Sequence, residues 1–291
     1  MLFRSPAPDL SPSAEHNGLD QSNLSYHAGL DYKLDGGALL YVSVSRGYKS
    51  GIISPIAASA TSEYTPAKQE RLDAYEVGFK APFLDHRVHL NAAAFYYDYT
   101  DKQLRSRLVD PTFGLLETLV NVPKSDIWGV QTDLVAQPIQ GLTLTASATY
   151  LDSDVTKSFN TFNEAGAFGD IEGSQLPNTP RVSIAADGQY ERPITGALDA
   201  FFGSSLTYHS KTNSTFDTPS APAPTFALKS YTILDLRAGI AASDGSWRLS
   251  VFAKNVTNTF YVLDVFNNVD TLYRDAGMPA TYGISLNVKW R

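Results

Sequence analysis

The sequence predicts an all-β protein, an antiparallel up-and-down transmembrane β-barrel, and three observations support this fold class. About eleven segments show apolar and polar residues in alternation, which places one kind of side chain on each face of a strand. The connections between these segments alternate between short and long. Aromatic residues, including 16 tyrosines and 15 phenylalanines, gather near segment ends, where membrane barrels carry their aromatic girdles.

The alternation is clearest at the end of the chain, where TYGISLNVKWR (281–291) has an apolar residue at every second position from Tyr282 to Trp290. NLSYHAGLDYKLD (23–35) and LTLTASATY (142–150) repeat it. Segments of about 9–13 residues suit a tilted crossing of a bilayer, whereas strands of globular proteins average about 5–6 residues. The alternative is a soluble β-rich binding or adhesion domain with aromatic residues in its core, and the polar face on every strand disfavours it.

The connections separate the two ends of the predicted wall. The short ones, at 36–37, 84–86, 137–141, 192–196 and 243–245, are rich in glycine, proline and aspartate, as tight turns require. We expect long loops at 50–68, 104–118, 153–178, 211–227 and 264–278. Short turns at one end and long loops at the other are typical of an outer-membrane barrel.

Composition excludes several classes of protein. The chain has 291 residues, 43% of them hydrophobic and 18% charged, which is enough apolar material for a folded protein. A net charge of -7 argues against a nucleic-acid partner. The absence of cysteine excludes a disulfide scaffold and thiolate metal sites. The N-terminus lacks the apolar stretch of a signal peptide, so we expect the start of a precursor to be missing if the protein is exported.

Several ordered motifs resemble one protein family. They are VSRGYKSG (44–51), YTPAKQERLDAYEVGFKAPF (64–83), the Gly-Val-Gln at 129–131, LPNTPRVSIAADGQY (176–190) and FAKNVTNTFY (252–261). From about residue 23 onward the chain resembles the C-terminal β-barrel portion of TonB-dependent outer-membrane receptors, of the type that takes up iron complexes or siderophores.

The resemblance implies a 22-stranded barrel with an N-terminal plug, of which about eleven strands are present and the plug is absent. It implies that 1–22 is the remnant of an extracellular loop and 23–291 the C-terminal half of the barrel. The expected function is active uptake of a scarce nutrient, a ferric siderophore or another iron complex, across the bacterial outer membrane. The expected partners are outer-membrane lipid, the TonB complex acting through the missing plug, the barrel-assembly machinery and the small ligand.

The resemblance also implies two sets of functional residues. A ligand arriving from outside would meet cations and rings of the long loops, which can bind an anionic, aromatic complex by charged hydrogen bonds and stacking. The candidates are Arg46, Tyr48, Lys49, Arg105, Arg107, Tyr273 and Arg274. The assembly signal of the last strand is Tyr282, Ile284, Leu286, Val288 and Trp290, although Arg291 follows the usual terminal aromatic residue. Polar positions such as Asp187 and Arg237 are expected to line the lumen.

No constellation predicts an enzyme, a resident metal or a cofactor. His209 with Ser210 is the only neighbouring pair that could begin a hydrolytic site. Glu164, Asp170 and Glu172 in one loop match no calcium-loop spacing, so we interpret them as solvated acids. The alternative function is that of a complete small outer-membrane barrel of about 12 strands, acting as a passive porin or an outer-membrane enzyme.

Overall fold

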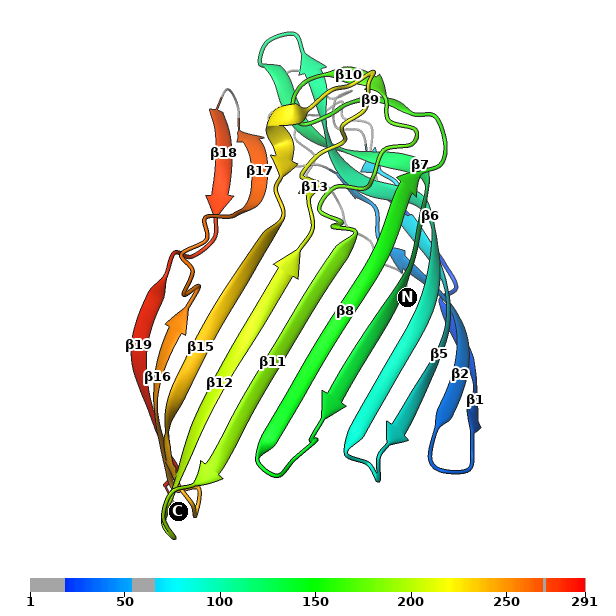
Figure 1. Cartoon of the computed structure of the whole chain (residues 1–291). Coiled ribbons are helices and arrows are strands. Elements are labelled where there is room, and N and C mark those ends of the chain that lie inside the picture. The colour runs from blue at the N-terminus through cyan, green and yellow to red at the C-terminus, as the bar shows by residue number, and fades with distance from the viewer. Residues whose placement is uncertain (1–18, 54–65, 269–270, 291) are drawn as a thin grey trace.

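The computed structural model describes residues 19–53, 66–268 and 271–290, and most of these form one large curved sheet (Figure 1). Its strands are β1 (Tyr26–Lys33), β2 (Leu39–Lys49), β5 (Glu70–Phe83), β6 (Val88–Asp110), β7 (Gly114–Ala136), β8 (Leu142–Val155), β11 (Val182–Pro193), β12 (Leu198–His209), β15 (Tyr231–Ala242), β16 (Trp247–Lys254) and β19 (Thr281–Val288). Most of the segment 1–22, expected to be a loop remnant, lies outside the described residues.

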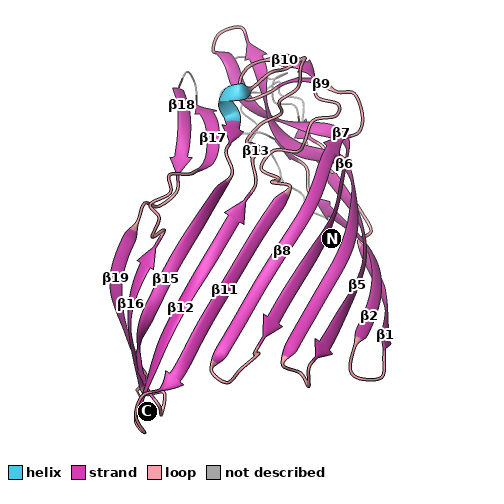
Figure 2. Cartoon of the chain, in the orientation of Figure 1, coloured by secondary structure: helices cyan, strands magenta, loops and turns pink. Residues whose placement is uncertain are grey.

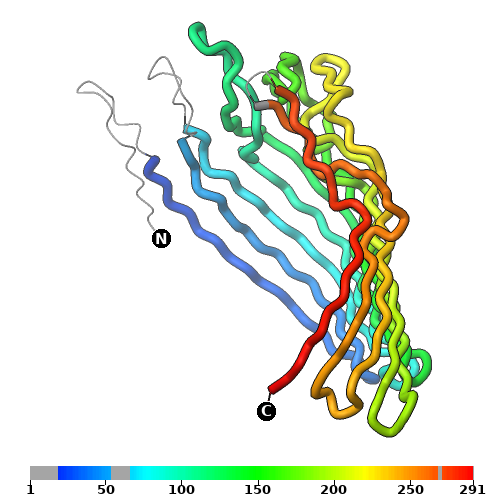
Figure 3. Tube along the Cα trace, turned by 90° about the vertical axis from the view of Figure 1, so that its left-hand side faces the viewer, coloured from blue at the N-terminus to red at the C-terminus, as the bar shows by residue number. Residues whose placement is uncertain are grey.

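The sheet is a single up-and-down wall. Its eleven strands lie in the order β1-β2-β5-β6-β7-β8-β11-β12-β15-β16-β19, so β1 and β19 form the two edges. Seen from the side, the wall bends like part of a cylinder (Figure 3). The all-β, antiparallel prediction and the number of strands are confirmed. Among the described residues, no helix is long and apolar enough to cross a membrane.

Each face of the wall has its own chemistry because the register aligns residues of one kind. Val42 pairs with Val77, while the next row pairs Ser43 with Glu76 on the other face. We call these the apolar face and the polar face. The apolar face stays uncovered even at large side chains, since Ile284 is 74% exposed. A soluble protein would bury such a face, so its exposure favours lipid as the neighbour.

The structure corrects the long loop expected at 104–118. β6 and β7 instead stay paired from Val88↔Ala136 to Asp110↔Gly114, far beyond the length of the other strands. Asp110 closes the hairpin, because its Oδ1 accepts hydrogen bonds from the backbone N–H groups of Thr112 and Phe113 at 2.6 and 2.7 Å. An Asp-Pro-x-x-Gly stretch favours such a tight turn, which lets β6 and β7 pair up to its two ends.

The other long connections fold together at one end of the wall, which we call the loop end. They contain the short strands β3 (Ile52–Ile53), β4 (Pro66–Ala67), β9 (Asn160–Phe162), β10 (Phe168–Asp170), β13 (Thr212–Asn213), β14 (Ala227–Leu228), β17 (Val262–Asn268) and β18 (Thr271–Ala276), and the 3-10 helix η2 (Pro224–Phe226), which stands out in Figure 2. Two buried clusters hold these loops. One comprises Val122, Val155, Ile171, Leu176 and Phe216, and the other Ala223, Phe226, Leu228 and Val265.

Glycines opposite aromatic residues recur on the polar face. The cross-strand pairs are Tyr41↔Gly78, Phe95↔Gly129, Phe201↔Gly239 and Phe252↔Gly283. At each of these glycines a Cβ atom would lie within 2.7 Å of the partner's ring. The rings therefore lie across the glycines and cover backbone that has no side chain of its own, as described for aromatic rescue in sheets.

Candidate functional site at the loop end

Two asparagines fix the base of the last long loop. Asn255 and Asn258 adopt φ of 47° and 48°, a left-handed conformation that asparagine tolerates better than most residues. Asn255 Nδ2 donates to the carbonyl oxygens of Thr259 at 2.9 Å and Met278 at 3.0 Å. Asn258 Oδ1 accepts from the N–H of Ala280 at 3.0 Å. The Lys-Asn-Val-Thr-Asn motif therefore joins the end of β16 to the chain that enters β19.

Above this base the β17–β18 hairpin projects from the wall (Figure 1). It carries two of the predicted ligand contacts, Tyr273 and Arg274, and both are exposed. The ring of Tyr273 stacks on Phe266 with centroids 5.4 Å apart and an interplanar angle of 12°. Tyr261 supports the hairpin base, because its ring lies 4.6 Å from that of Tyr231 and against Gly277. The hairpin thus presents a ring and a cation to solvent from a rigid base.

The hairpin touches the long β6–β7 hairpin through a predicted ligand contact. Arg107 Nη2 donates to the carbonyl oxygen of Asn267 at 3.1 Å, across 160 residues of sequence. Asn267 Nδ2 in turn donates to the carbonyl oxygen of Glu164 at 2.8 Å, in the loop between β8 and β11. Four of the predicted residues, Arg105, Arg107, Tyr273 and Arg274, therefore lie on two hairpins in contact at the loop end.

The charges in this contact are unevenly paired. Arg107 and Glu164 are each only 5% exposed, yet no ion pair joins them among the described residues. Arg107 Nε has no hydrogen-bond partner within the part of the chain that the structure describes. Burial, followed by the charge of Glu117, raises the pKa of Glu164 above its ordinary range. Arg105 is exposed and its Nε lies 3.4 Å from Glu117 Oε1.

The three predicted contacts on β2 lie apart from this cluster. Arg46 Nη2 donates to Asp73 Oδ2 at 2.9 Å, and its guanidinium lies 5.5 Å from the ring centroid of Tyr26. Arg46 and Tyr48 share the apolar face of β2, whereas Lys49 belongs to the polar face. β2 and β17–β18 lie at opposite sides of the wall, and the structure does not bring them together (Figure 3).

His209, Ser210 and Asp170, which the sequence offered as candidates for a hydrolytic or metal site, each have other partners. His209 Nδ1 lies 3.0 Å from Ser183 Oγ, while Ser210 Oγ accepts from the N–H of Val182 at 3.0 Å. Asp170 accepts from Ser158 Oγ at 2.6 Å and from two backbone N–H groups, and these bonds hold its pKa below the usual range. Within the described ranges, no three metal-ligating side chains converge.

The polar face carries an ion-pair network whose members are remote in sequence. Arg237 donates to both oxygens of Asp187 at 2.7 and 2.8 Å and also to Gln189 Oε1 at 3.1 Å. Arg248 Nη1 donates to Glu191 Oε2 at 3.2 Å. Alternation alone placed Asp187 and Arg237 on the polar face, but only the register of β11, β12 and β15 makes them partners.

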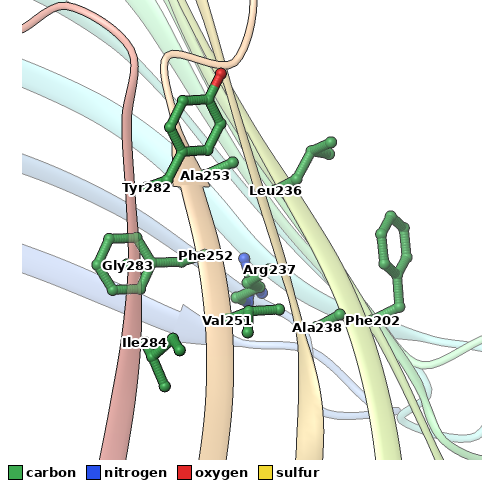
Figure 4. A pocket seen from close by; sticks show the side chains of 10 residues that line it. All are labelled: Phe202, Leu236, Arg237, Ala238, Val251, Phe252, Ala253, Tyr282, Gly283 and Ile284. Atoms are coloured by element: carbon green, nitrogen blue, oxygen red, sulfur yellow. The ribbon is translucent and has the colours of Figure 1, made fainter.

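The opposite face holds a shallow apolar groove next to the predicted assembly segment (Figure 4). It is lined by Phe202, Leu236, Ala238, Val251, Ala253, Tyr282 and Ile284, with the chain of Arg237, Phe252 and Gly283 beneath. Tyr282, Ile284, Leu286 and Val288 follow one face of β19, and Trp290 beyond it is 93% exposed. The groove has the character of a lipid-facing surface.

Comparison with known proteins gives a consistent match. Residues 5–276 match the family model of the TonB-dependent receptor-like β-barrel. A probable TonB-dependent siderophore receptor of Acinetobacter baumannii, PiuA, is 28% identical over 183 residues, which cover 59% of this chain and 23% of PiuA.

Solved structures match over nearly the whole chain. The ferric yersiniabactin uptake receptor FyuA from Yersinia pestis has a TM-score of 0.73 at 19% identity, covering 95% of this chain and 39% of FyuA. The structure of PiuA has a TM-score of 0.68 at 22% identity, covering 96% of this chain and 38% of that one. At these identities the likeness concerns the fold alone. The chain spans less than half the length of each of these relatives.

Proposed function

Because the chain belongs to the TonB-dependent receptor β-barrel family, we propose that it forms part of the wall of an outer-membrane receptor that actively takes up a ferric siderophore or another iron complex. The observation that carries the iron-complex assignment is the similarity to PiuA, a probable siderophore receptor. The loop end is then extracellular. The opposite end of the wall, which carries the short turns and which we call the turn end, is periplasmic, and the polar face lines the lumen.

The loop-end cluster supports the ligand-binding part of the proposal. Arg105 and Arg274 are exposed cations, and Tyr273 is an exposed ring on the neighbouring hairpin. One guanidinium group can donate two parallel hydrogen bonds to the two oxygens of a carboxylate or similar group, and aromatic rings stack on planar chelating groups. An anionic, aromatic iron complex fits this combination better than a neutral sugar or a cation does.

The two faces of the wall support the proposed partners. The Asp187–Arg237 and Glu191–Arg248 pairs give the lumen a polar surface for a plug domain, through which the TonB complex would act. On the other side, the apolar face fits outer-membrane lipid. The exposed row of β19 from Tyr282 to Val288, continued by Trp290, supplies a signal for the barrel-assembly machinery.

Uptake of radiolabelled iron complexes by the host tests this function. Deleting the gene should abolish uptake of at least one ferric siderophore, and removing the energy supply should have the same effect. Replacing Arg105 and Arg107 together by Ala should weaken binding by about 10-fold or more, since a hydrogen bond to a charged group contributes about 1.5–3 kcal/mol. Arg87→Ala, at an exposed turn-end position, is the matched control. Normal uptake of every iron complex by the deletion strain would refute the proposal.

The alternative of a complete small barrel has no observation in its favour. A passive porin or a barrel enzyme needs a closed wall, because unpaired backbone groups are costly in lipid. β1 and β19 are the edges of the described sheet and are not hydrogen-bonded to each other.

A further inference from the structure

The apolar groove has a floor of small side chains between two walls of large ones. Ala238 of β15 and Ala253 of β16 form the floor. The walls are exposed apolar and aromatic side chains, which Figure 4 shows on the two sides of the groove: Phe202 and Leu236 on one side, and Val251, Tyr282 and Ile284 on the other. The groove is therefore a trough in the apolar face, open toward the surroundings of the wall.

The floor of the groove runs diagonally across the strands. Ala238 pairs with Val251, and Ala253 lies two residues beyond Val251 on β16. Two residues advance about 6.8 Å along a strand and neighbouring strands lie about 4.8 Å apart, so the diagonal makes an angle of about 35° with the strands.

This diagonal is nearly parallel to the membrane normal. Strands of outer-membrane barrels are tilted by about 35–45° from the normal. In Figure 1 the strands lean to the right toward the loop end, whereas β12, β15 and β16 follow one another to the left. The tilt and the diagonal therefore cancel, and the floor follows the direction in which lipid chains lie.

Toward the turn end the diagonal leads to a cation. Ala200 of β12 lies one diagonal step below Ala238, because Ala200 pairs with Ile240. Arg192 of β11 pairs with Ala200, so it shares the apolar face, and its side chain is exposed. Arginine at the border of an apolar surface extends its guanidinium toward the polar layer, where it can donate two parallel hydrogen bonds to a phosphate.

The length of the diagonal fits one leaflet. Ala200, Ala238 and Ala253 are separated by two diagonal steps, about 17 Å in all. The hydrocarbon of one leaflet is about 15 Å thick, half of the bilayer core. Lipid chains are as apolar as the walls, so the hydrophobic effect does not select an occupant. Close packing in the trough and a charged hydrogen bond at its end do select one.

We propose that the groove holds one acyl chain of a glycerophospholipid from the periplasmic leaflet, with the lipid phosphate bound to Arg192. This inference rests on the proposed function for the orientation of the wall, and it adds an ordered lipid at a defined place. Because Tyr282 and Ile284 belong to β19, the seated chain contacts the last strand together with β12, β15 and β16.

Two kinds of substitution test the site. Arg192→Gln removes the partner of the phosphate, so retention of phospholipid should fall about 10-fold or more, as expected for the loss of a hydrogen bond between charged groups. Ala238→Leu combined with Ala253→Leu fills the floor, so retention should fall to a similar extent while the cation remains. The matched controls are Arg87→Gln, at another exposed turn-end position, and Ala186→Leu, on the apolar face of β11 outside the groove.

The experiment uses the receptor purified from host outer membranes in a mild detergent. Native mass spectrometry counts the lipids that stay bound, and extraction identifies them. The parent and both controls should keep one glycerophospholipid that Arg192→Gln and the filled groove lose. A trace of phosphatidylglycerol with a nitroxide in the middle of one chain, in phosphatidylcholine vesicles that contain the receptor, should show an immobilised fraction that the same two variants lack.

Four results would overturn the inference: a parent that retains no lipid, retention that survives Arg192→Gln or the filled groove, lipid A in place of a glycerophospholipid, or a receptor dimer that the filled groove dissociates. Arg192→Lys keeps the charge but not the planar donor edge, so retention between those of the parent and Arg192→Gln would support the phosphate contact. Lipid retention that follows Arg192 in a receptor that takes up no iron complex would reject the proposed function alone, and uptake without retention would reject this inference alone.

Discussion

Gly239→Ala tests whether the aromatic-glycine pairs of the polar face determine the stability of the wall. Gly239 lies opposite Phe201 of β12, and a Cβ atom there would come within 2.1 Å of the Leu249 carbonyl oxygen and 2.6 Å of the Phe201 ring. The ring has little room to retreat, since Phe201 is 4% exposed and the guanidinium of Arg248 lies 3.5 Å from its centroid. Adding one methyl group therefore displaces backbone as well as a side chain.

The magnitude follows from the space available. Overpacking a filled site costs about 1–3 kcal/mol. Gly47 is the matched control, because it also lies on the polar face of a strand and a Cβ there would meet nothing within 4 Å. Gly47→Ala should stabilise the protein by about 0.4–1 kcal/mol through the lower entropy of its unfolded chain. The two variants should thus differ by roughly 1.5–4 kcal/mol, or more than about 10-fold in the folding equilibrium.

Urea unfolding of the outer-membrane protein in detergent, followed by tryptophan fluorescence, measures this difference. Combining Gly239→Ala with Phe201→Ala should recover only part of the loss, because the Leu249 carbonyl remains in the way. Equal midpoints for Gly239→Ala and Gly47→Ala would show that the wall yields freely at this position and would refute the reasoning.

Three other outcomes follow from the loop end and the last strand. Asn255→Ala should destabilise the hairpin base by about 1–3 kcal/mol and speed its proteolysis, with the exposed Thr257→Ala as control. Burial raises the pKa of Glu164, so its contribution to the stability of the loops is present below the ordinary glutamate pKa and is lost as pH rises through the raised value. Protease protection of the loops should therefore fall with rising pH in the parent and change less in Glu164→Gln. Trp290→Ala should lower the amount of receptor in the outer membrane on a fractionation blot, and an unchanged amount would reject the assembly role.

The sequence alone was sufficient for the architecture of the wall. A strand sends alternate side chains to opposite faces, so the period of two located the strands and the division between apolar and polar faces directly. Turn chemistry at positions such as Gly36 and Gly245, both with positive φ, located the short connections. The ordered motifs from 44–51 to 252–261 together indicated the family, and the match over 5–276 confirms it.

Contacts between remote segments were decided only by the tertiary structure. Nothing in the sequence indicates that Arg107 meets Asn267, that Asp187 meets Arg237, or that rings cover glycines on the neighbouring strand of the sheet. Alternation reports which face a residue occupies, but cross-strand register and loop packing depend on many weak contacts made at once. The same limit explains the hairpin at 104–118, where we expected a long loop and pairing of β6 with β7 satisfied the backbone instead.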